Sequence, residues 1–249
     1  MLVVRPMMPE LNRVYQGDCV AMMKTWPAKF VHMIWTDPPY GHGNHDGDLN
    51  ARLNDHRGTE NKPIANDDAD SMRIVVGDML DEAARILTTP YSCCCCCCGG
   101  GGPRPTFAWL AQRMDERGLQ FFHSVIWDKI NPGLGWRYRR QHEMVMVAHR
   151  KDGKLIWGDE DVALPNIMRY SKPRNSEHPN EKPVELAARF IAAHTKPGDI
   201  ILDPFCGSGT TLVAAERLGR KWIGIELDPK WARLAEERVA AESAQGKLL

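Results

Sequence analysis

Short apolar runs alternate along this chain with longer amphipathic segments, and the alternation predicts an α/β fold. Seven runs have the length and composition of buried strands: residues 14–15, 31–36, 93–98, 119–127, 143–148, 199–202 and 221–225. Strands that alternate with helices usually pair in parallel within one sheet. The pattern therefore predicts a Rossmann-like, seven-stranded, mostly parallel sheet with helices on both faces.

The segments between these runs carry apolar residues at helical spacing, as Ile74, Val75 and Met79 do. They predict helices at residues 18–26, 71–87, 106–117, 183–194, 210–218 and 229–241. Residues 41–70 are polar and have no period, so we interpret them as a loop or small insertion. At 249 residues the chain is expected to form a single domain.

The composition is ordinary for a globular protein, with 43% apolar and 26% charged residues. No run of about 18 apolar residues occurs, so we expect no membrane span. Residues 1–9 lack the apolar core of a secretion signal. A cytoplasmic setting with reduced thiols follows from these features.

Six of the eight cysteines form one run, Cys93 to Cys98, which four glycines follow. Neighbouring residues of a strand point to opposite faces, and cysteine is small and apolar enough to pack in a core. We interpret the run as a buried strand that leads into a glycine loop. A zinc site is the minority interpretation, and a damaged or misread stretch of coding sequence is a third.

The net charge is zero, but the charge is unevenly distributed. Residues 129–154 hold seven Lys or Arg and two acids, a net charge of +5, whereas acids outnumber bases in residues 46–70. Phosphate binding needs positive charge only where phosphates lie. The basic stretch is therefore compatible with DNA binding, although a solvated basic surface explains the charge equally well.

The first motif with chemical content is DPFCGSGT at residues 203–210, between a predicted strand and a predicted helix. Gly207 and Gly209 allow a sharp turn and a close approach to a ligand. The motif lacks the third glycine of the dinucleotide fingerprint. The next predicted strand ends at Glu226, 23 positions after Asp203. A carboxylate there suits two ribose hydroxyls, so the pair predicts a nucleoside site of the adenosylmethionine kind.

The second motif is DPPY at residues 37–40, which also follows an apolar strand. Ligands of open α/β sheets bind at the carboxyl ends of strands, so both motifs should open onto one crevice. The Asp37 carboxylate and the Pro38 carbonyl can each accept one N–H bond from an aromatic amine, with Pro38 and Pro39 fixing the backbone. Tyr40 offers a face on which a flipped base can stack.

These motifs resemble those of the amino-methyltransferases of DNA. TDPPYG (residues 36–41) precedes DPFCGSGT, and this circularly permuted order resembles the β class of that family. Further matches are Gly17-Asp18, VIWDK (residues 125–129), RRQHE (residues 139–143) and HPNEKP (residues 178–183). The resemblance covers most of the chain, with residues 41–70 and the Cys/Gly run as departures.

The resemblance implies S-adenosyl-L-methionine as cofactor and no metal ion. It implies a catalytic role for Asp37, Pro38, Pro39 and Tyr40. The implied cofactor contacts are Asp18, Asp203, Phe205, Gly207, Ser208, Gly209, Thr210, Glu226 and Lys182. Lys182 is explained equally well as a solvated lysine at a helix start. Cys206 is expected to fill space in the turn.

Double-stranded DNA is the partner that the resemblance implies, in a prokaryotic or phage-encoded protein. Sequence recognition is expected from residues 129–180, with candidate DNA contacts at Lys129, Arg137, Arg139, Arg140, Arg169 and Arg174. For each of these residues phosphate is the more frequent target than a base edge. A cognate restriction endonuclease and a homodimer are both compatible with the sequence.

The expected function is transfer of a methyl group to the exocyclic amine of a flipped base, adenine N6 in a short duplex site. Family members with Asp as the first letter of DPPY usually act on adenine, and those with Ser usually act on cytosine N4. Cytosine N4 therefore stays an alternative. Methyltransferases of RNA or of a protein glutamine more often carry Asn-Pro-Pro-Tyr or place the cofactor motif first, and this chain does neither. A catalytically impaired nucleic-acid-binding relative is a further alternative, against which the intact Asp37, Tyr40 and Glu226 speak.

Overall fold

The computed structural model describes residues 6–41, 68–99, 106–133, 139–157, 164–173 and 181–246. The strands are β1 (Arg13–Gln16), β2 (Met33–Thr36), β3 (Tyr91–Gly99), β4 (Leu119–Asp128), β5 (His142–Arg150), β6 (Lys154–Leu155), β7 (Ile167–Arg169), β8 (Ile200–Asp203) and β9 (Lys221–Glu226). The helices are α1 (Cys19–Lys24), α3 (Ala69–Ile86), α4 (Thr106–Glu116), α5 (Val184–His194), α6 (Thr210–Arg217) and α7 (Pro229–Gly246). The expected loop at 41–70 lies almost wholly outside the described residues.

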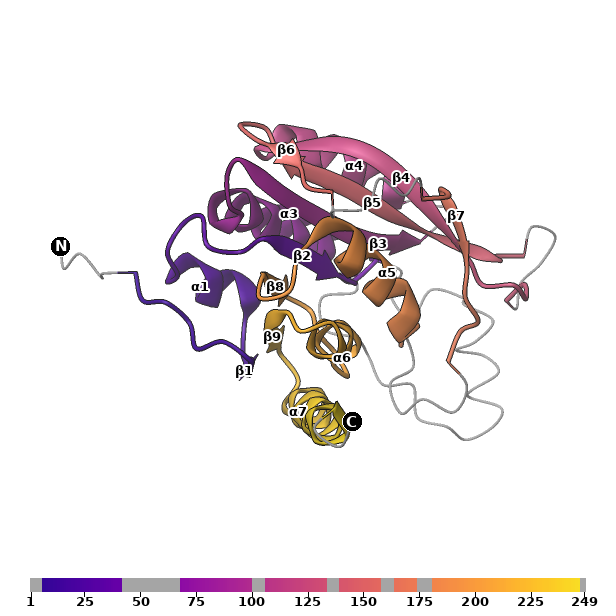
Figure 1. The fold of residues 1–249 in the computed structure, drawn as a ribbon. Coiled ribbons are helices and arrows are strands. Elements are labelled where there is room, and N and C mark those ends of the chain that lie inside the picture. The colour runs from indigo at the N-terminus through magenta and orange to yellow at the C-terminus, as the bar shows by residue number, and fades with distance from the viewer. Residues whose placement is uncertain are drawn as a thin grey trace.

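The strands form one sheet in the order β1-β9-β8-β2-β3-β5-β4-β7, with β6 paired to β3 (Figure 1). Only β5 runs antiparallel to its neighbours β3 and β4, and every other described pair is parallel. The prediction of a mostly parallel α/β sheet is confirmed. Strand β2 lies between β8 and β3, although β8 comes more than 160 residues later in the sequence.

All seven expected strands are present, and two short ones raise the number of strands in the described sheet to nine. Strand β6 has two residues and β7 has three. Neither is long enough to show an alternation of apolar and polar residues, so the sequence pattern could not reveal them. Both pair with strands in the half of the sheet that lies away from β1 and β9.

Helices cover both faces of the sheet, as predicted. One apolar cluster joins the sheet to α5, α6 and α7, through residues such as Phe190, Leu212 and Ala235. The other cluster joins it to α1, α3 and α4, through residues such as Leu80 and Leu110. None of the described helices is long and apolar enough to cross a membrane.

The cysteine run forms the central strand β3 and is fully buried. Cys93, Cys95 and Cys97 belong to one apolar cluster, and Cys94, Cys96 and Cys98 belong to the other. The thiols therefore serve as small apolar side chains on both faces of a strand, as the sequence suggested. Within the described part of the chain, no group of three or more His, Cys, Asp or Glu side chains is placed to hold a metal ion.

Local signals explain where the helices near the sheet's carboxyl edge begin. Asp18 caps α1, because its carboxylate accepts the backbone N–H of Ala21 at 2.7 Å. Asp68 caps α3 in the same way through the N–H of Ser71 at 2.9 Å. Helix α6 begins directly after Gly209, whose φ of 82° is in the left-handed region that glycine tolerates best.

Candidate active site

The two sequence motifs end neighbouring parallel strands. Met33 of β2 pairs with Ile201 of β8, and Ile34 pairs with Leu202. Their carboxyl ends therefore reach the same edge of the sheet, where the DPPY segment and the glycine turn follow. The hydroxyl of Thr36, directly before Asp37, donates to the Asp203 carboxylate at 2.8 Å. Segments that are far apart in the chain are thus joined by a direct hydrogen bond.

Asp203 lies beneath the turn rather than on its surface, with 3% of its area exposed. It accepts hydrogen bonds from the hydroxyls of Thr36 and Thr211, at 2.8 and 2.5 Å, and from the backbone N–H of Phe205 at 3.1 Å. Burial nevertheless raises the pKa of Asp203 to about 7, although these hydrogen bonds act to lower it. Asp203 therefore connects β2, the glycine turn and α6 through hydrogen bonds.

Glu226 lies at the end of β9, beside the glycine turn. Its carboxylate accepts the backbone N–H of Gly207 at 2.8 Å and that of Asp228 at 2.9 Å. Burial raises the pKa of Glu226, and those backbone donors oppose the rise. A carboxylate has about four acceptor positions, so about two are left for further hydroxyl donors. The Glu226 carbonyl accepts the N–H of Gly17 at 2.8 Å, which brings the Asp18 loop alongside.

The turn is packed so closely that glycine is required at position 209. A Cβ there would lie 2.9 Å from the Cβ of Ala235 on α7. Gly207 also has a positive φ, 49°. Ser208 and Thr210 are buried in the turn, and Phe205 packs against the apolar cluster of α1, α3 and α4.

This end of the sheet has carboxylate acceptors placed for the hydroxyl and amine donors of an adenosine nucleoside with an amino-acid tail. Glu226 and Asp18 follow the ends of the paired strands β9 and β1, since Gln16 pairs with Glu226. The turn adds backbone that is partly exposed at Gly207, whereas Gly209 is buried against Ala235 of α7. The residues present therefore fit S-adenosyl-L-methionine.

Asp37 belongs to a cluster of charged side chains above β2 and β5. The Lys182 ammonium lies 2.6 Å from Asp37 Oδ2 and 3.1 Å from Glu143 Oε2. The Tyr40 hydroxyl donates to Asp37 Oδ1 at 2.6 Å and lies 3.3 Å from Glu143 Oε2. Lys129 Nζ lies 3.3 Å from Glu143 Oε1. Two carboxylates and two ammonium groups therefore alternate in one network.

The network keeps its charges in spite of burial. Burial opposes the ionisation of Glu143, but Lys182 and Lys129 hold its pKa at about 2. Burial and Glu143 raise the pKa of Asp37, and Lys182 opposes this rise. Burial works against the charge of Lys182, yet Asp37 and Glu143 raise its pKa above the usual lysine range. The Asp37 side chain keeps 26% of its surface exposed, so a ligand can reach it, whereas Lys182 keeps 8%.

The DPPY segment is held at both ends. Thr36 is anchored on Asp203, and the Tyr40 carbonyl accepts the Thr106 hydroxyl at the start of α4, at 2.9 Å. Pro38 is buried and Pro39 is partly buried between these anchors. Burial and the Asp37 charge raise the pKa of Tyr40 well above its usual value, so its hydroxyl stays a donor.

The sequence placed Lys182 among the cofactor contacts, whereas in the structure its ammonium contacts Asp37 of the DPPY segment. Glu143 was named only as part of RRQHE, and its position against Lys182 and Tyr40 was not foreseen. Glu181 and Arg238 were also missed: they bond to each other at 2.8 Å and both reach Ser208. The HPNEKP motif was the available signal for Glu181, but nothing local marks Arg238.

Of the candidate DNA contacts, the four that the structure describes lie around the same carboxyl edge. Arg169 is 75% exposed and pairs with Asp128 at 2.9 Å. Arg139 donates to the carbonyls of Gly133 and Pro132, and Arg140 is exposed. Lys129 is turned inward to Glu143. Arg137 and Arg174 lie outside the described residues.

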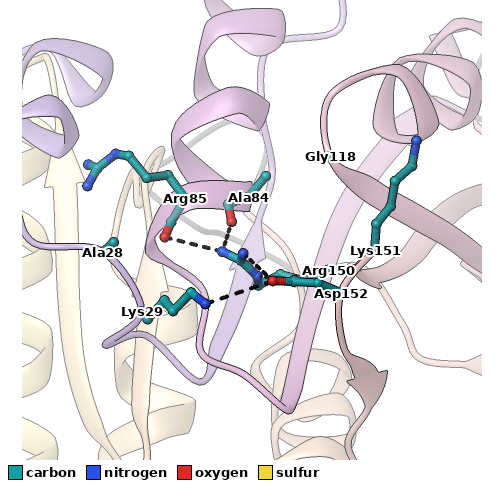
Figure 2. A pocket seen from close by; sticks show the side chains of 8 residues that line it. All are labelled: Ala28, Lys29, Ala84, Arg85, Gly118, Arg150, Lys151 and Asp152. Carbon is teal, nitrogen blue, oxygen red and sulfur yellow. Dashed lines mark hydrogen bonds and ion pairs between the residues drawn. The ribbon is translucent and has the colours of Figure 1, made fainter.

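A pocket of about 390 Å³ lies at the opposite edge of the sheet, where the parallel strands begin (Figure 2). Its lining residues are Ala28, Lys29, Ala84, Arg85, Gly118, Arg150, Lys151 and Asp152. Its cations already have partners: Arg150 donates to the carbonyls of Ala84 and Arg85 and pairs with Asp152, as Figure 2 shows. These carbonyls end α3, so Arg150 caps a helix C-terminus here.

Comparison with known sequences places the chain in a family. Residues 31–237 match the sequence model of the N6/N4 DNA methylases. The match includes both motif strands and most of the chain. The protein therefore belongs to this DNA methylase family, in agreement with the resemblance of its motifs.

Two relatives are similar over different lengths. The putative methylase YubD of Escherichia coli (strain K12) is 29% identical over 231 residues, which are 93% of this chain and 91% of YubD. The type II methyltransferase M2.DpnII of Streptococcus pneumoniae is 33% identical over 150 residues, which are 52% of this chain and 55% of that protein.

Solved structures share the fold. TTHA0409 from Thermus thermophilus, in complex with S-adenosyl-L-methionine, superposes with a TM-score of 0.67 at 26% identity, covering 93% of this chain and 95% of its own. The cytosine-N4-specific PvuII DNA methyltransferase reaches a TM-score of 0.68 at 20% identity, over 95% and 96% of the two chains. The PvuII likeness concerns the fold alone.

Proposed function

We propose that this protein is an S-adenosyl-L-methionine-dependent DNA methyltransferase that acts on the exocyclic amine of a flipped base, adenine N6 in a short duplex site. The observation that carries the proposal is the juxtaposition of Asp37 with the glycine turn, through the 2.8 Å bond from Thr36 to Asp203. Membership of the DNA methylase family supports the class of reaction. The complex of TTHA0409 with S-adenosyl-L-methionine supports the cofactor.

Glu226 would hold the ribose of the cofactor through its two remaining acceptor positions. Asp18 would accept from the adenine amine, and the backbone of Gly207 and Gly209 would contact the amino-acid end. Phe205 would line the same site. When bound, the cofactor supplies a methyl group on a positively charged sulfonium, which makes that methyl group electrophilic.

The protein's own part in the reaction is to orient the amine. The lone pair of an aromatic amine is delocalised into the ring, which makes it a weak nucleophile. Asp37 and the Pro38 carbonyl accept its two N–H bonds and so favour a localised lone pair. Asp37 has acceptor positions left beside those taken by Lys182 and Tyr40. Because both loops are anchored before the base arrives, little reorganisation is needed.

Tyr40 gives the flipped base a stacking surface, which offsets part of the cost of a few kcal/mol of taking a base out of the duplex. The exposed Arg140 and Arg169 would hold phosphates around the site. Exclusion of water from this edge would strengthen the electrostatic interaction between Asp37 and the amine.

The substitution Asp37→Ala tests the central assignment. We expect methyl transfer to fall by at least about 100-fold, because a preorganised acceptor of the amine is lost. Tritiated methyl incorporation into unmethylated duplex DNA measures this loss, and calorimetric titration with S-adenosyl-L-methionine should show nearly unchanged affinity. Glu237→Ala, an exposed carboxylate on α7, is the matched control. Full methyltransferase activity of the Asp37→Ala variant would refute the role of Asp37 as acceptor of the amine.

The choice of adenine rests on the aspartate at the first position of DPPY. Cytosine N4 is the second candidate, because the family model that matches this chain covers both N6 and N4 methylases. Mass spectrometry of nucleosides from methylated DNA distinguishes N6-methyladenine from N4-methylcytosine. Parallel assays with single-stranded DNA and RNA test whether duplex DNA is the preferred substrate.

A further inference from the structure

Two neighbouring residues in front of α5 reach the two halves of the site. Glu181 contacts the cofactor turn: its Oε1 lies 2.8 Å from Arg238 and its Oε2 lies 3.4 Å from the Ser208 hydroxyl. Arg238 also donates to the Ser208 carbonyl at 2.8 Å. Lys182, the next residue, lies 2.6 Å from the Asp37 carboxylate. One dipeptide therefore contacts both the turn and the catalytic segment.

The backbone that carries this dipeptide is stiff. Pro183 restricts the residue before it to extended conformations, which directs neighbouring side chains to opposite sides. Pro183 is the N-cap residue of α5, whose Leu186, Phe190 and Ile191 are buried in the core. We therefore expect a displacement of the turn to reach Lys182 through this short segment.

The charges explain why such a link matters for Asp37. Asp37 and Glu143 both face Lys182, and the Tyr40 hydroxyl lies between the two carboxylates. Among the described residues, the charged or titratable groups near Asp37 are Tyr40, Cys97, Cys98, Lys129, Glu143, Lys172, Lys182 and Asp203. Without the Lys182 charge, two carboxylates would remain close together with less compensation, and one of them would tend to take up a proton.

We propose that Glu181 and Lys182 form a clamp that holds the cofactor turn and the Asp37 carboxylate in one mutual geometry, which makes both of them positioning residues for methyl transfer. This inference rests on the proposed function. It assigns Lys182 to the catalytic carboxylate instead of to the cofactor. It also adds Glu181 and Arg238 to the residues on which the rate depends.

The pH dependence of kcat distinguishes this role from a structural one. Asp37 accepts from the amine only as a carboxylate, so activity falls as the pH drops through its pKa. Lys182→Met removes a cation that lowers this pKa, so the acidic limb of the profile should move to higher pH by about 1–3 units. Lys182→Arg keeps the charge and should leave the limb in place. An unmoved limb in a folded Lys182→Met protein overturns the assignment.

A double-substitution cycle tests the link between the two ends. Glu181→Gln releases the turn side of the clamp, and we expect a lower kcat although Glu181 does not touch Asp37. Both substitutions loosen the same clamp. The fold-reduction of the plateau kcat in the double variant, Glu181→Gln with Lys182→Met, should therefore be smaller than the product of the two single fold-reductions. Effects that multiply would show that the two residues act independently. Glu185→Gln, an exposed acid in the first turn of α5, is the control.

The two proposals fail in different ways. Active wild-type protein with an unshifted Lys182→Met profile refutes the clamp and leaves the methyltransferase assignment intact. Wild-type protein that transfers no methyl group to any nucleic acid refutes the proposed function. In that case the Lys182–Asp37 link is judged from thermal unfolding of Lys182→Met, Asp37→Asn and the double variant, where additive effects would refute it as well.

Discussion

Asp203 should make the stability of this protein depend on pH in a way that a single substitution can isolate. Its pKa is about 7 in the folded protein and 3.8 as an ordinary carboxyl. Between these values the folded protein holds a proton that the unfolded chain releases. The free energy of unfolding therefore decreases as the pH rises from about 4 to about 7, and the contribution is lost above pH 7.

The magnitude follows from the size of the shift. One pKa unit corresponds to about 1.4 kcal/mol, so the contribution of Asp203 should fall by about 2 to 3 kcal/mol between pH 5 and pH 8. Asp203→Asn has nearly the same shape and cannot titrate. The hydroxyls of Thr36 and Thr211 can rotate to accept from its amide. The variant should therefore lose this part of the pH dependence and keep the fold.

Urea unfolding at pH 5, 6, 7 and 8, followed by tryptophan fluorescence, measures the effect. Other ionisable groups also contribute to the pH dependence of stability. The informative quantity is therefore the free energy of unfolding of the wild type minus that of Asp203→Asn at each pH. We expect this difference to decrease as the pH rises. Parallel curves for the two proteins would show that Asp203 is ionised at pH 5 and that its burial does not control its protonation.

Three further predictions concern packing, capping and thiol chemistry. Gly209→Ala should destabilise the fold by about 1–3 kcal/mol in urea unfolding, since the added Cβ would overlap Ala235. The control is Gly219→Ala, whose Cβ meets no atom within 4 Å, so that only the strain of the left-handed backbone should lower its stability. Arg150→Met should lower stability by about 1–3 kcal/mol because the last carbonyls of α3 lose their donor, with the exposed Lys154→Met as control. All eight cysteines are free and buried, and burial raises the pKa of Cys19 and Cys98 to about 12. A thiol reagent should therefore react slowly with the native protein and label eight thiols per chain in denaturant. Rapid labelling of the native protein would contradict the burial of β3.

The sequence by itself determined seven of the nine strands in the described sheet, the helices that cover it and the class of reaction. The strands that end in Asp37 and Asp203 were predicted because apolar runs of this length, followed by turn residues, are typical of buried parallel strands. The alternation of Cys93 to Cys98 between two cores follows from the two-residue period of a strand. The order of the two motifs along the chain was enough to indicate the family.

Only the tertiary structure decided which side chains meet. Lys182 pairs with Asp37 across 145 positions of sequence, and Arg238 reaches Glu181 across 57. No local period encodes such pairs, because they depend on how β2, β5 and β8 are ordered in the sheet and on how α5 and α7 pack against it. The burial of Asp203 has the same origin: its motif predicted a turn, but the neighbouring strand and helix supplied the hydroxyls that surround it and the low-dielectric setting that raises its pKa.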